Sequence, residues 1–306
     1  MGRYLVGRLL QGVLVVFGVT VVVFVATRMI GDPVNFILPL SASQEQRDRL
    51  RTDLGFDRSL LSQFVDYIGD VFRFDFGKST KFTNEDTIDV VLRFLPKTLQ
   101  LVIAGMLVAF LVSLVLGMLS ALKPGKVTDK LLVTLSLLGL SMPQFFLAQV
   151  LIVFFSVRFG WVQIGPGPWT HMILPAVALA LPAIGRLAMT VRSAMIDELN
   201  SQYVKAAKAK GMRRRRIVAV HALRNAAIPF VTLAGWEFIR ALAGFTVVVE
   251  GVFGLNGMGS LAILAIRERD FFLIQTIVLV VAVIVVIVNI AIDFAYKAVD
   301  PRVKLG

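Results

Sequence analysis

The sequence predicts an all-α membrane protein with six transmembrane helices. Of its 306 residues, 57% are hydrophobic and 17% are charged, and the mean hydropathy is +0.80. Soluble domains are typically about 45–50% apolar and about 25% charged, so both departures indicate lipid as the solvent. Apolar stretches long enough to cross a hydrocarbon core of about 30 Å recur along the chain, and they are too continuously apolar for barrel strands. The predicted spans are residues 6–29, 98–122, 131–156, 171–193, 226–249 and 271–296.

The first span follows a basic N-terminus that could also begin a signal peptide. Arg3 and Arg8 precede the apolar run Leu9–Ala26. This run is longer than the apolar region of a signal peptide, which is about 7–15 residues, and no small-x-small cleavage site follows it. We therefore expect residues 1–30 to be a retained N-terminal transmembrane helix.

Residues 31–97 are expected to form an extracytoplasmic loop with short helices. The segment has nine basic and eleven acidic residues, a balance that an outer loop tolerates. An amphipathic stretch at 60–68 predicts a helix on the outer rim. Gly77-Lys78-Ser79 resembles the end of a phosphate-binding loop, but Phe72 stands where the first glycine is required, so we expect no nucleotide site.

Spans three and five carry polar side chains that could line a path through the membrane. Glu237 and Arg240 lie three residues apart in a predicted helix, so they share a face and can pair. Ionisable residues within a membrane usually face the bundle interior or a water-filled cavity. Gln144 and Gln149 follow Pro143, which is expected to kink span three. These four polar residues are the path candidates, and the alternative is a charge pair that only stabilises the bundle.

Four glycines separate spans five and six. Gly251, Gly254, Gly257 and Gly259 predict a non-helical segment that folds back toward the membrane. Such backbone is tolerated only against protein or a water-filled path, so this segment is a candidate for the outer mouth of a pathway.

Other polar residues of the spans are expected to have local roles. Arg186 and Arg192 in span four are expected near its cytoplasmic end, where they would anchor lipid headgroups or pair with a docked partner. Asn289 and Asp293 in span six are expected to hydrogen-bond a neighbouring helix.

Positive charge predicts the topology. The net charge is +12, and Lys and Arg concentrate in the loops 123–130 and 192–225 and in the tail 297–304. With six spans, these segments and the N-terminus fall on one side, which the positive-inside rule makes cytoplasmic. Nucleic-acid binding is not expected, because the basic residues flank apolar spans and no basic patch interleaves with stacking aromatics.

The sulfur and imidazole content argues against several kinds of chemistry. The chain has no cysteine, which excludes a disulfide framework, a thiolate metal site and a cysteine nucleophile. Its two histidines, His171 and His221, lack metal-ligand spacing. We expect no metal site.

The most informative segment is the basic loop 197–225. It predicts a helix, a glycine stop and a second helix, because alanines at 206, 207 and 209 favour helix and Gly211 can take the left-handed conformation that ends one. A short helix with a small-residue face suits insertion into a cleft on a partner. The plain alternative is a loop whose charge only fixes orientation.

This loop resembles the EAA loop of the permease subunits of binding-protein-dependent ABC importers. The matching residues are Ala206, Ala207, Gly211 and Leu223. Lys205 stands at the motif's glutamate, and the motif's terminal proline falls at Arg224, with Pro229 five residues later. These departures resemble the oligopeptide/dipeptide branch of the family.

The resemblance extends along the whole chain. Further matching segments are Arg3-Tyr4, Gly31-Asp32-Pro33, Leu54-Gly55-Phe56-Asp57, Asp75-Phe76-Gly77-Lys78-Ser79, Leu95-Pro96-Lys97-Thr98-Leu99, Gly139-Leu140-Ser141-Met142-Pro143, Val248-Val249-Glu250 and Asp300-Pro301-Arg302. The long outer loop after the first span favours the B-type subunit. Glu237 and Arg240 depart from the family, which usually has uncharged residues there.

The resemblance implies a type I ABC importer permease fold, with residues 98–306 as a permease core of five helices that includes the coupling loop 197–225. It implies a non-catalytic subunit that couples to two cytoplasmic ATPases, pairs with a second related permease and receives substrate from an extracytoplasmic binding protein. ATP and Mg²⁺ would be bound by the ATPases, so no cofactor is expected in this chain. The residues implied for ATPase coupling are Tyr203, Val204, Lys205, Ala206, Ala207, Lys208, Ala209, Gly211, Met212 and Arg213.

The expected location is the inner or plasma membrane of a bacterium or archaeon, with both termini cytoplasmic. The expected cargo is a di- or oligopeptide. A nickel chelate, glutathione or a sugar-derived solute remains an alternative, because in this family specificity rests largely with the binding protein. Two other classes stay open: an ion-coupled secondary carrier with Glu237 as relay, and an assembly scaffold without transport.

Overall fold

The computed structural model describes residues 2–29, 34, 38, 41–83 and 85–299. Two of the motifs quoted above, Gly31-Asp32-Pro33 and Asp300-Pro301-Arg302, lie outside the described residues, as does the end of the basic tail. Within the described part every regular element is a helix, which confirms the predicted all-α class.

The long helices match the order of the predicted spans, with differences in span three and at the starts of spans two and five. Those long and apolar enough to cross a membrane are the runs Tyr4–Met29, Thr87–Leu122, Trp169–Asn200, Arg214–Phe253 and Phe271–Ala295. A bent pair, Val127–Ser141 and Gln144–Arg158, adds a sixth span if both halves are counted as one. The α-helices of eight or more residues in these runs are α1 (Gly2–Met29), α5 (Thr87–Leu122), α6 (Val127–Ser141), α7 (Gln144–Leu151), α8 (Ile173–Asn200), α11 (Leu223–Arg240), α12 (Thr246–Phe253) and α14 (Phe271–Val299).

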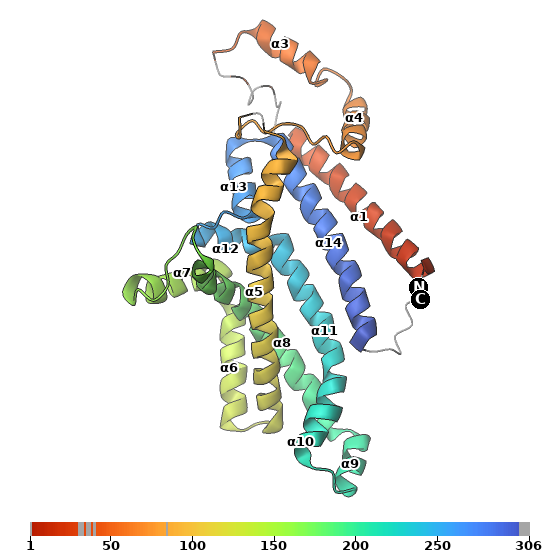
Figure 1. The fold of residues 1–306 in the computed structure, drawn as a ribbon, viewed down its shortest axis with the longest axis vertical. Helices are drawn as coiled ribbons and strands as arrows, with labels where there is room; N and C mark the ends of the chain where they lie inside the picture. The colour runs from red at the N-terminus through yellow and green to blue at the C-terminus, as the bar shows by residue number, and fades with distance from the viewer. Residues whose placement is uncertain (1, 30–33, 35–37, 39–40, 84, 300–306) are drawn as a thin grey trace.

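Span three bends more sharply at Pro143 than the expected kink. The axes of its two halves differ by 107°, and the break falls at Met142 and Pro143. Met142 has extended backbone angles (φ −82°, ψ 133°), the conformation that a following proline imposes. The proline therefore ends one helix and turns the next, α7, so that it runs sideways from the end of α6 (Figure 1).

The starts of spans two and five also differ from prediction. Helix α5 begins at Thr87, so Pro96 lies inside it rather than opening it, and the predicted boundary at residue 97 falls within the helix. The fifth span begins at Arg214 rather than at 226. Hydropathy marks only the apolar part of a helix, and both helices continue as polar extensions beyond that part.

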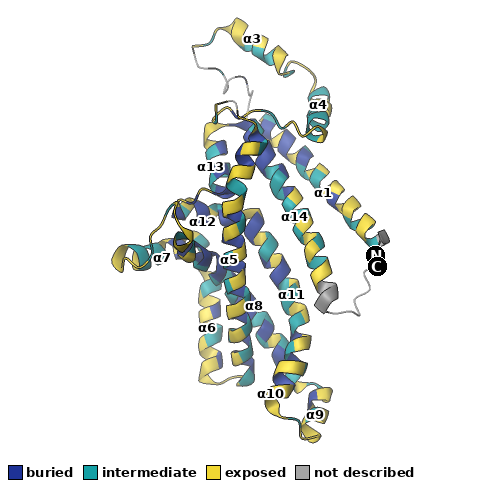
Figure 2. Cartoon of the chain, viewed as in Figure 1, coloured by how far each residue is buried: buried dark blue, intermediate teal, exposed yellow. Residues whose placement is uncertain are grey.

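The bundle is arranged around α5 and α8. Helix α5 runs along most of the molecule, with α6, α8 and α11 toward one end and α1, α13 (Met258–Glu268) and α14 toward the other (Figure 1). Buried residues line the inner faces, and exposed residues cover the outer ones (Figure 2). Small side chains let α5 and α8 approach closely: a Cβ added at Gly117 would lie 2.6 Å from the carbonyl oxygen of Ala188.

Two short helices, α3 (Gln44–Asp53) and α4 (Leu60–Phe72), lie beyond the end of the bundle formed by α13 and the start of α5 (Figure 1). Helix α4 is attached to α1 by Phe64, whose ring packs edge-on against the ring of Phe24. The two ring centroids are 5.2 Å apart. Arg28 Nε also donates to Gln63 Oε1 at 2.9 Å. The loop is therefore held against the first helix.

The Gly77-Lys78-Ser79 segment has a structural role in this fold. Ser79 Oγ donates to Asp270 Oδ2 at 2.5 Å, and the backbone N–H groups of Thr80 and Lys81 donate to the same oxygen at 2.9 and 3.2 Å. Asp270 stands in the turn between α13 and α14 and caps α14 through the Leu273 N–H. The segment thus fastens the chain between α4 and α5 to this turn.

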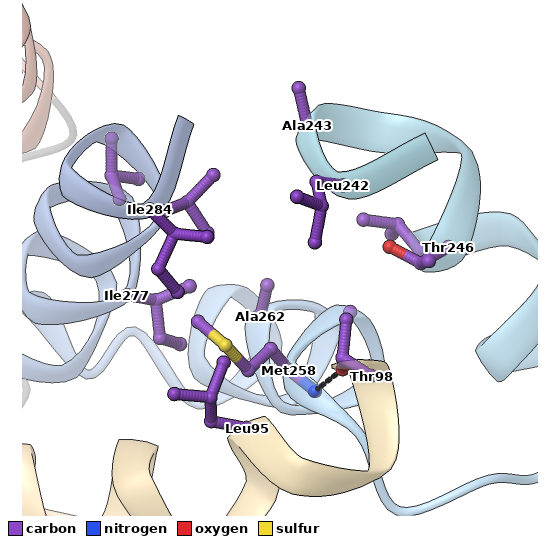
Figure 3. Close-up of a pocket in the computed structure, with 13 residues that line it drawn as sticks. Leu95, Thr98, Leu242, Ala243, Thr246, Met258, Ala262, Ile277 and Ile284 are labelled. Atoms are coloured by element: carbon purple, nitrogen blue, oxygen red, sulfur yellow. Dashed lines mark hydrogen bonds between the residues drawn. The ribbon is translucent and has the colours of Figure 1, made fainter. Parts of the chain in front are cut away.

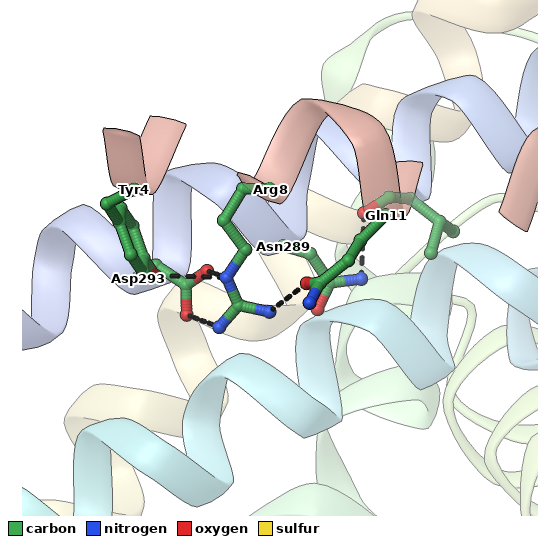
Figure 4. Close-up of polar contacts among 6 residues, drawn as sticks. Tyr4, Arg8, Gln11, Asn289 and Asp293 are labelled. Carbon is green, nitrogen blue, oxygen red and sulfur yellow. Dashed lines mark hydrogen bonds and ion pairs between the residues drawn. The ribbon is translucent and has the colours of Figure 1, made fainter. Parts of the chain in front are cut away.

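A polar contact joins the first and last helices. Arg8 donates to Asp293, with Nη2 3.0 Å from Oδ1 and Nε 2.8 Å from Oδ2, and its Nε also contacts the Tyr4 hydroxyl (Figure 4). This confirms the expected bond from Asp293 to a neighbouring helix. Asn289 instead donates to the carbonyl of Val285 in its own helix.

Candidate functional site

The basic loop forms a helical hairpin at the end of the molecule opposite α3 and α4 (Figure 1). Helix α9 spans Gln202–Ala209, Gly211 has φ +73°, and a new helical run starts at α10 (Arg214–Arg216). This confirms the predicted order of helix, glycine stop and helix. A π-helical turn, Ile217–Ala222, then leads into α11.

Helix α9 packs through one side chain and presents the others. Val204 is fully buried, while Ala207 and Met212 are partly buried. The remaining coupling candidates are exposed: Tyr203, Lys205, Ala206, Lys208, Ala209, Gly211 and Arg213. The free face of the hairpin therefore combines small residues with a high density of positive charge.

Hydrogen bonds fix the hairpin to the bundle. The Tyr203 hydroxyl donates to Glu198 Oε2 at 2.5 Å, and Asn225 Nδ2 donates to both oxygens, at 3.2 Å to Tyr203 and 3.0 Å to Glu198. Burial and the neighbouring Glu198 carboxylate raise the pKa of Tyr203, so the hydroxyl keeps its proton. This cluster ties α9 to the end of α8 and the start of α11.

Tyr203→Phe is expected to loosen the hairpin without unfolding the chain. It removes hydrogen bonds worth about 1 kcal/mol, which corresponds to a change of up to about fivefold in a coupled equilibrium. If the hairpin couples to ATPases, as its resemblance implies, ATP-dependent uptake should fall by that order. Tyr4→Phe, which removes a hydroxyl on α1 far along the chain, is the control, and equal uptake in both variants would contradict the positioning role.

A buried carboxylate lies inside the bundle. Glu237 on α11 is 1% exposed, and Arg186 on α8 binds it with two donors, Nε to Oε1 at 2.5 Å and Nη2 to Oε2 at 2.7 Å. Arg240 Nη1 lies 3.6 Å from Oε1 of the same carboxylate. The predicted Glu237–Arg240 pair is therefore one part of a triad, and Arg186 is the closer partner.

A cavity of about 170 Å³ adjoins this triad. Gln144, Arg186 and Glu237 line it, together with apolar residues of α5, α8 and the turn after α11. Arg240 is 45% exposed and lies with its guanidinium 5.0 Å from the ring centroid of Phe245, another lining residue. Three of the four path candidates thus gather at one place, whereas Gln149 is exposed on α7 and does not line the cavity.

A second buried ion pair lies nearer the hairpin. Arg192 on α8 binds Asp129 on α6, with Nε 2.6 Å from Oδ1 and Nη2 2.8 Å from Oδ2. The Gly125 N–H and the Ser120 hydroxyl also donate to Asp129. The expectation that Arg186 and Arg192 serve lipid headgroups or a docked partner is therefore wrong, because each is bound to a carboxylate within the chain.

The glycine-rich segment after span five encloses a third carboxylate. Glu250 is 1% exposed and accepts from Thr98 Oγ1 at 2.6 Å and from the Gly259 N–H at 2.7 Å. A Cβ at Gly257 would lie 2.4 Å from its carboxyl carbon, so glycine makes room for it. The predicted non-helical segment is only residues 254–257, since Gly251 and Gly259 are helical.

A cavity of about 200 Å³ lies beside this segment, between α5, α13, α14 and the turn after α11. Its lining is apolar apart from Thr98 and Thr246, and Thr98 accepts from the Met258 N–H at 2.8 Å (Figure 3). This arrangement offers apolar contact surface and no charged group.

A sequence model of the binding-protein-dependent transport system inner membrane components matches residues 113–305. The chain belongs to this family. As an inner membrane component of a transport system, it is a multi-pass membrane protein, and the resemblance seen in the basic loop is confirmed.

Two curated relatives match this chain over nearly its whole length. "Probable peptide ABC transporter permease protein y4tP" of Sinorhizobium fredii is 33% identical over 314 residues, which is 99% of this chain and 100% of the relative. The glutathione transport system permease protein GsiC of Escherichia coli K12 is 34% identical over 304 residues, covering 99% of each.

A solved structure supports the fold of this transport component. A chain from the inward-facing MetNI methionine ABC transporter aligns with a TM-score of 0.58 and 20% identity, over 68% of this chain and 95% of that one. The type I importer permease fold is therefore confirmed.

Proposed function

We propose that this permease imports di- or oligopeptides. The observation that carries the proposal is full-length similarity, at 33%, to a relative named for peptide transport. The 34% identity to a glutathione permease supports glutathione, itself a small peptide, as the second candidate cargo. A nickel chelate or a sugar-derived solute is the remaining alternative within the family.

The hairpin is proposed as the site at which the ATPases dock. Helix α9 is short, carries exposed alanines and a basic face, and is fastened to α8 and α11 by Tyr203, Glu198 and Asn225. Two cytoplasmic ATPases would supply ATP and Mg²⁺, a second related permease would complete the path, and a binding protein would deliver substrate on the side of α3 and α4. With the hairpin on the cytoplasmic side and six spans, both termini would also be cytoplasmic.

The triad of Arg186, Glu237 and Arg240 is proposed to line the path with Gln144. The support is burial of Glu237, the adjoining cavity, and the tendency of intramembrane charges to face water-filled spaces. Gln149, exposed on α7, is proposed to lie farther along the same path.

Reconstitution tests these proposals. In proteoliposomes, the permease pair with its ATPases, binding protein and ATP should take up a labelled tripeptide, and ATP removal should abolish uptake. Uptake by this chain alone, driven by a proton or sodium gradient, would instead establish a secondary carrier. ATP-dependent uptake of glutathione but not of other tripeptides would select the second candidate.

A further inference from the structure

Three irregular places in the helices meet at the charged cavity. Span three is broken at Pro143, α8 contains Pro182, and a π-helical turn, Ala241–Phe245, follows α11. Residues from each of these places line the cavity. Irregular backbone at membrane depth is tolerated where it borders protein or a water-filled cavity, and π-helical turns are frequent at functional sites. The irregularities surround a space inside the bundle.

The charges at this cavity do not balance. Arg186 and Arg240 both contact the single carboxylate of Glu237, which is the one acidic residue among the cavity's lining residues. The triad therefore carries a net charge of about +1, with Glu237 buried and Arg240 45% exposed, and a charge within a membrane-spanning bundle usually faces the interior or a water-filled cavity. Glu237 occupies Nε and Nη2 of Arg186 and leaves Nη1 for another acceptor.

Gln144 adds an unpaired amide to the same cavity. Both its Nε2 and its Oε1 are buried and have no hydrogen-bond partner in the described part of the chain. Buried polar groups are nearly always paired, so each exception needs an explanation. Gln144 also begins α7, whose N-terminal end carries partial positive charge. The Gln144 amide N–H and the N-terminal end of α7 favour a small anion, whereas Gln144 Oε1 needs a donor.

We propose that this cavity binds the carboxylate of the substrate, a deepening that rests on the proposed import of peptides. The carboxylate would accept from Arg186 Nη1 and Gln144 Nε2, while Arg240 balances the charge of Glu237. A singly charged anion brings the site to neutrality; an ammonium group would raise it to +2, and a phosphate dianion would leave it negative. A volume of about 170 Å³ admits an end group rather than a whole peptide.

The test compares trialanine with its C-terminal amide in the reconstituted importer. The measured quantity is the ratio of the two uptake rates, which does not depend on how much importer assembles. Arg240→Gln is expected to lower the acid-to-amide ratio at least about fivefold relative to wild type, and Arg240→Lys to restore it. Arg267→Gln, an exposed arginine on α13, is the matched control and should leave the ratio unchanged.

Because all variants share one binding protein, a change in the ratio belongs to the permease. A wild-type ratio in Arg240→Gln overturns the carboxylate site. Loss of the second permease from the purified Arg240→Gln importer would show that Arg240 contacts that subunit instead of balancing Glu237, and also overturns the site. Absence of uptake of either peptide by wild type overturns the peptide-import proposal itself.

Discussion

ATP-driven uptake is expected to fall at least about tenfold when Gly211 is replaced by proline. Gly211 has φ +73° at the end of α9, and proline is confined to φ near −65°, so the turn cannot form as it stands. The strain of about 3 kcal/mol would be relieved by moving α9 relative to the helix that starts at Arg214. The membrane spans should remain folded, because a Cβ added at Gly211 would meet no other part of the chain within 4 Å beyond its two neighbours.

The measurement is co-purification of the ATPases together with uptake in proteoliposomes. Gly160→Pro is the matched control, since Gly160 also has positive φ (+64°) and open space around it but lies in the loop before α8. Gly211→Asn should retain most activity, because asparagine tolerates the left-handed conformation. An unchanged partnership and uptake in Gly211→Pro would count against α9 as the coupling helix.

Breaking the Asp129–Arg192 pair is expected to cost about 3–5 kcal/mol of stability. Asp129→Leu leaves a guanidinium that is 23% exposed without its bidentate partner, and it removes the acceptor for the Gly125 N–H and Ser120. Ser120, which is buried, then loses its hydrogen bond away from solvent. The loss should appear as a lower midpoint of thermal unfolding in detergent.

A double-mutant cycle separates the pair from its surroundings. Asp129→Leu with Arg192→Leu should recover most of the loss, because apolar residues often replace a buried ion pair at little cost. Asp66→Asn, in the exposed Arg58–Asp66 pair, is the control and should change stability by less than about 1 kcal/mol. A loss in the double variant equal to the sum of the losses in Asp129→Leu alone and Arg192→Leu alone would show that the pairing energy is negligible.

Hydropathy and one motif predicted most of the fold and the hairpin. The span count, the helix–glycine–helix order and the pairing of Glu237 with Arg240 follow from local pattern, because residues three or four apart share a helix face. The break at Pro143 could have been expected as more than a kink, since a proline also forces the preceding residue out of the helical conformation.

The long-range partners could not be read from a single sequence. Arg186 and Glu237 are 51 positions apart, and Arg192 and Asp129 are 63 apart, so no helical periodicity relates them. One signal was available: Asp129 is a lone acid in a basic loop, and a carboxylate near a membrane span needs a cationic partner. Which arginine it binds depends on how the helices pack.

Helix α8 bears Arg186, Arg192 and Glu198 at intervals of six residues, and each side chain bonds to a different neighbour. From the first to the last is about 18 Å of one rod, at about 1.5 Å per residue. Under the proposed mechanism, movement of the hairpin would therefore displace α8 as one rigid helix, and this would move the wall of the cavity. The nucleotide state of the ATPases and the binding of substrate in the cavity would then both depend on the position of α8. A cross-link that immobilised α8 would block changes in both.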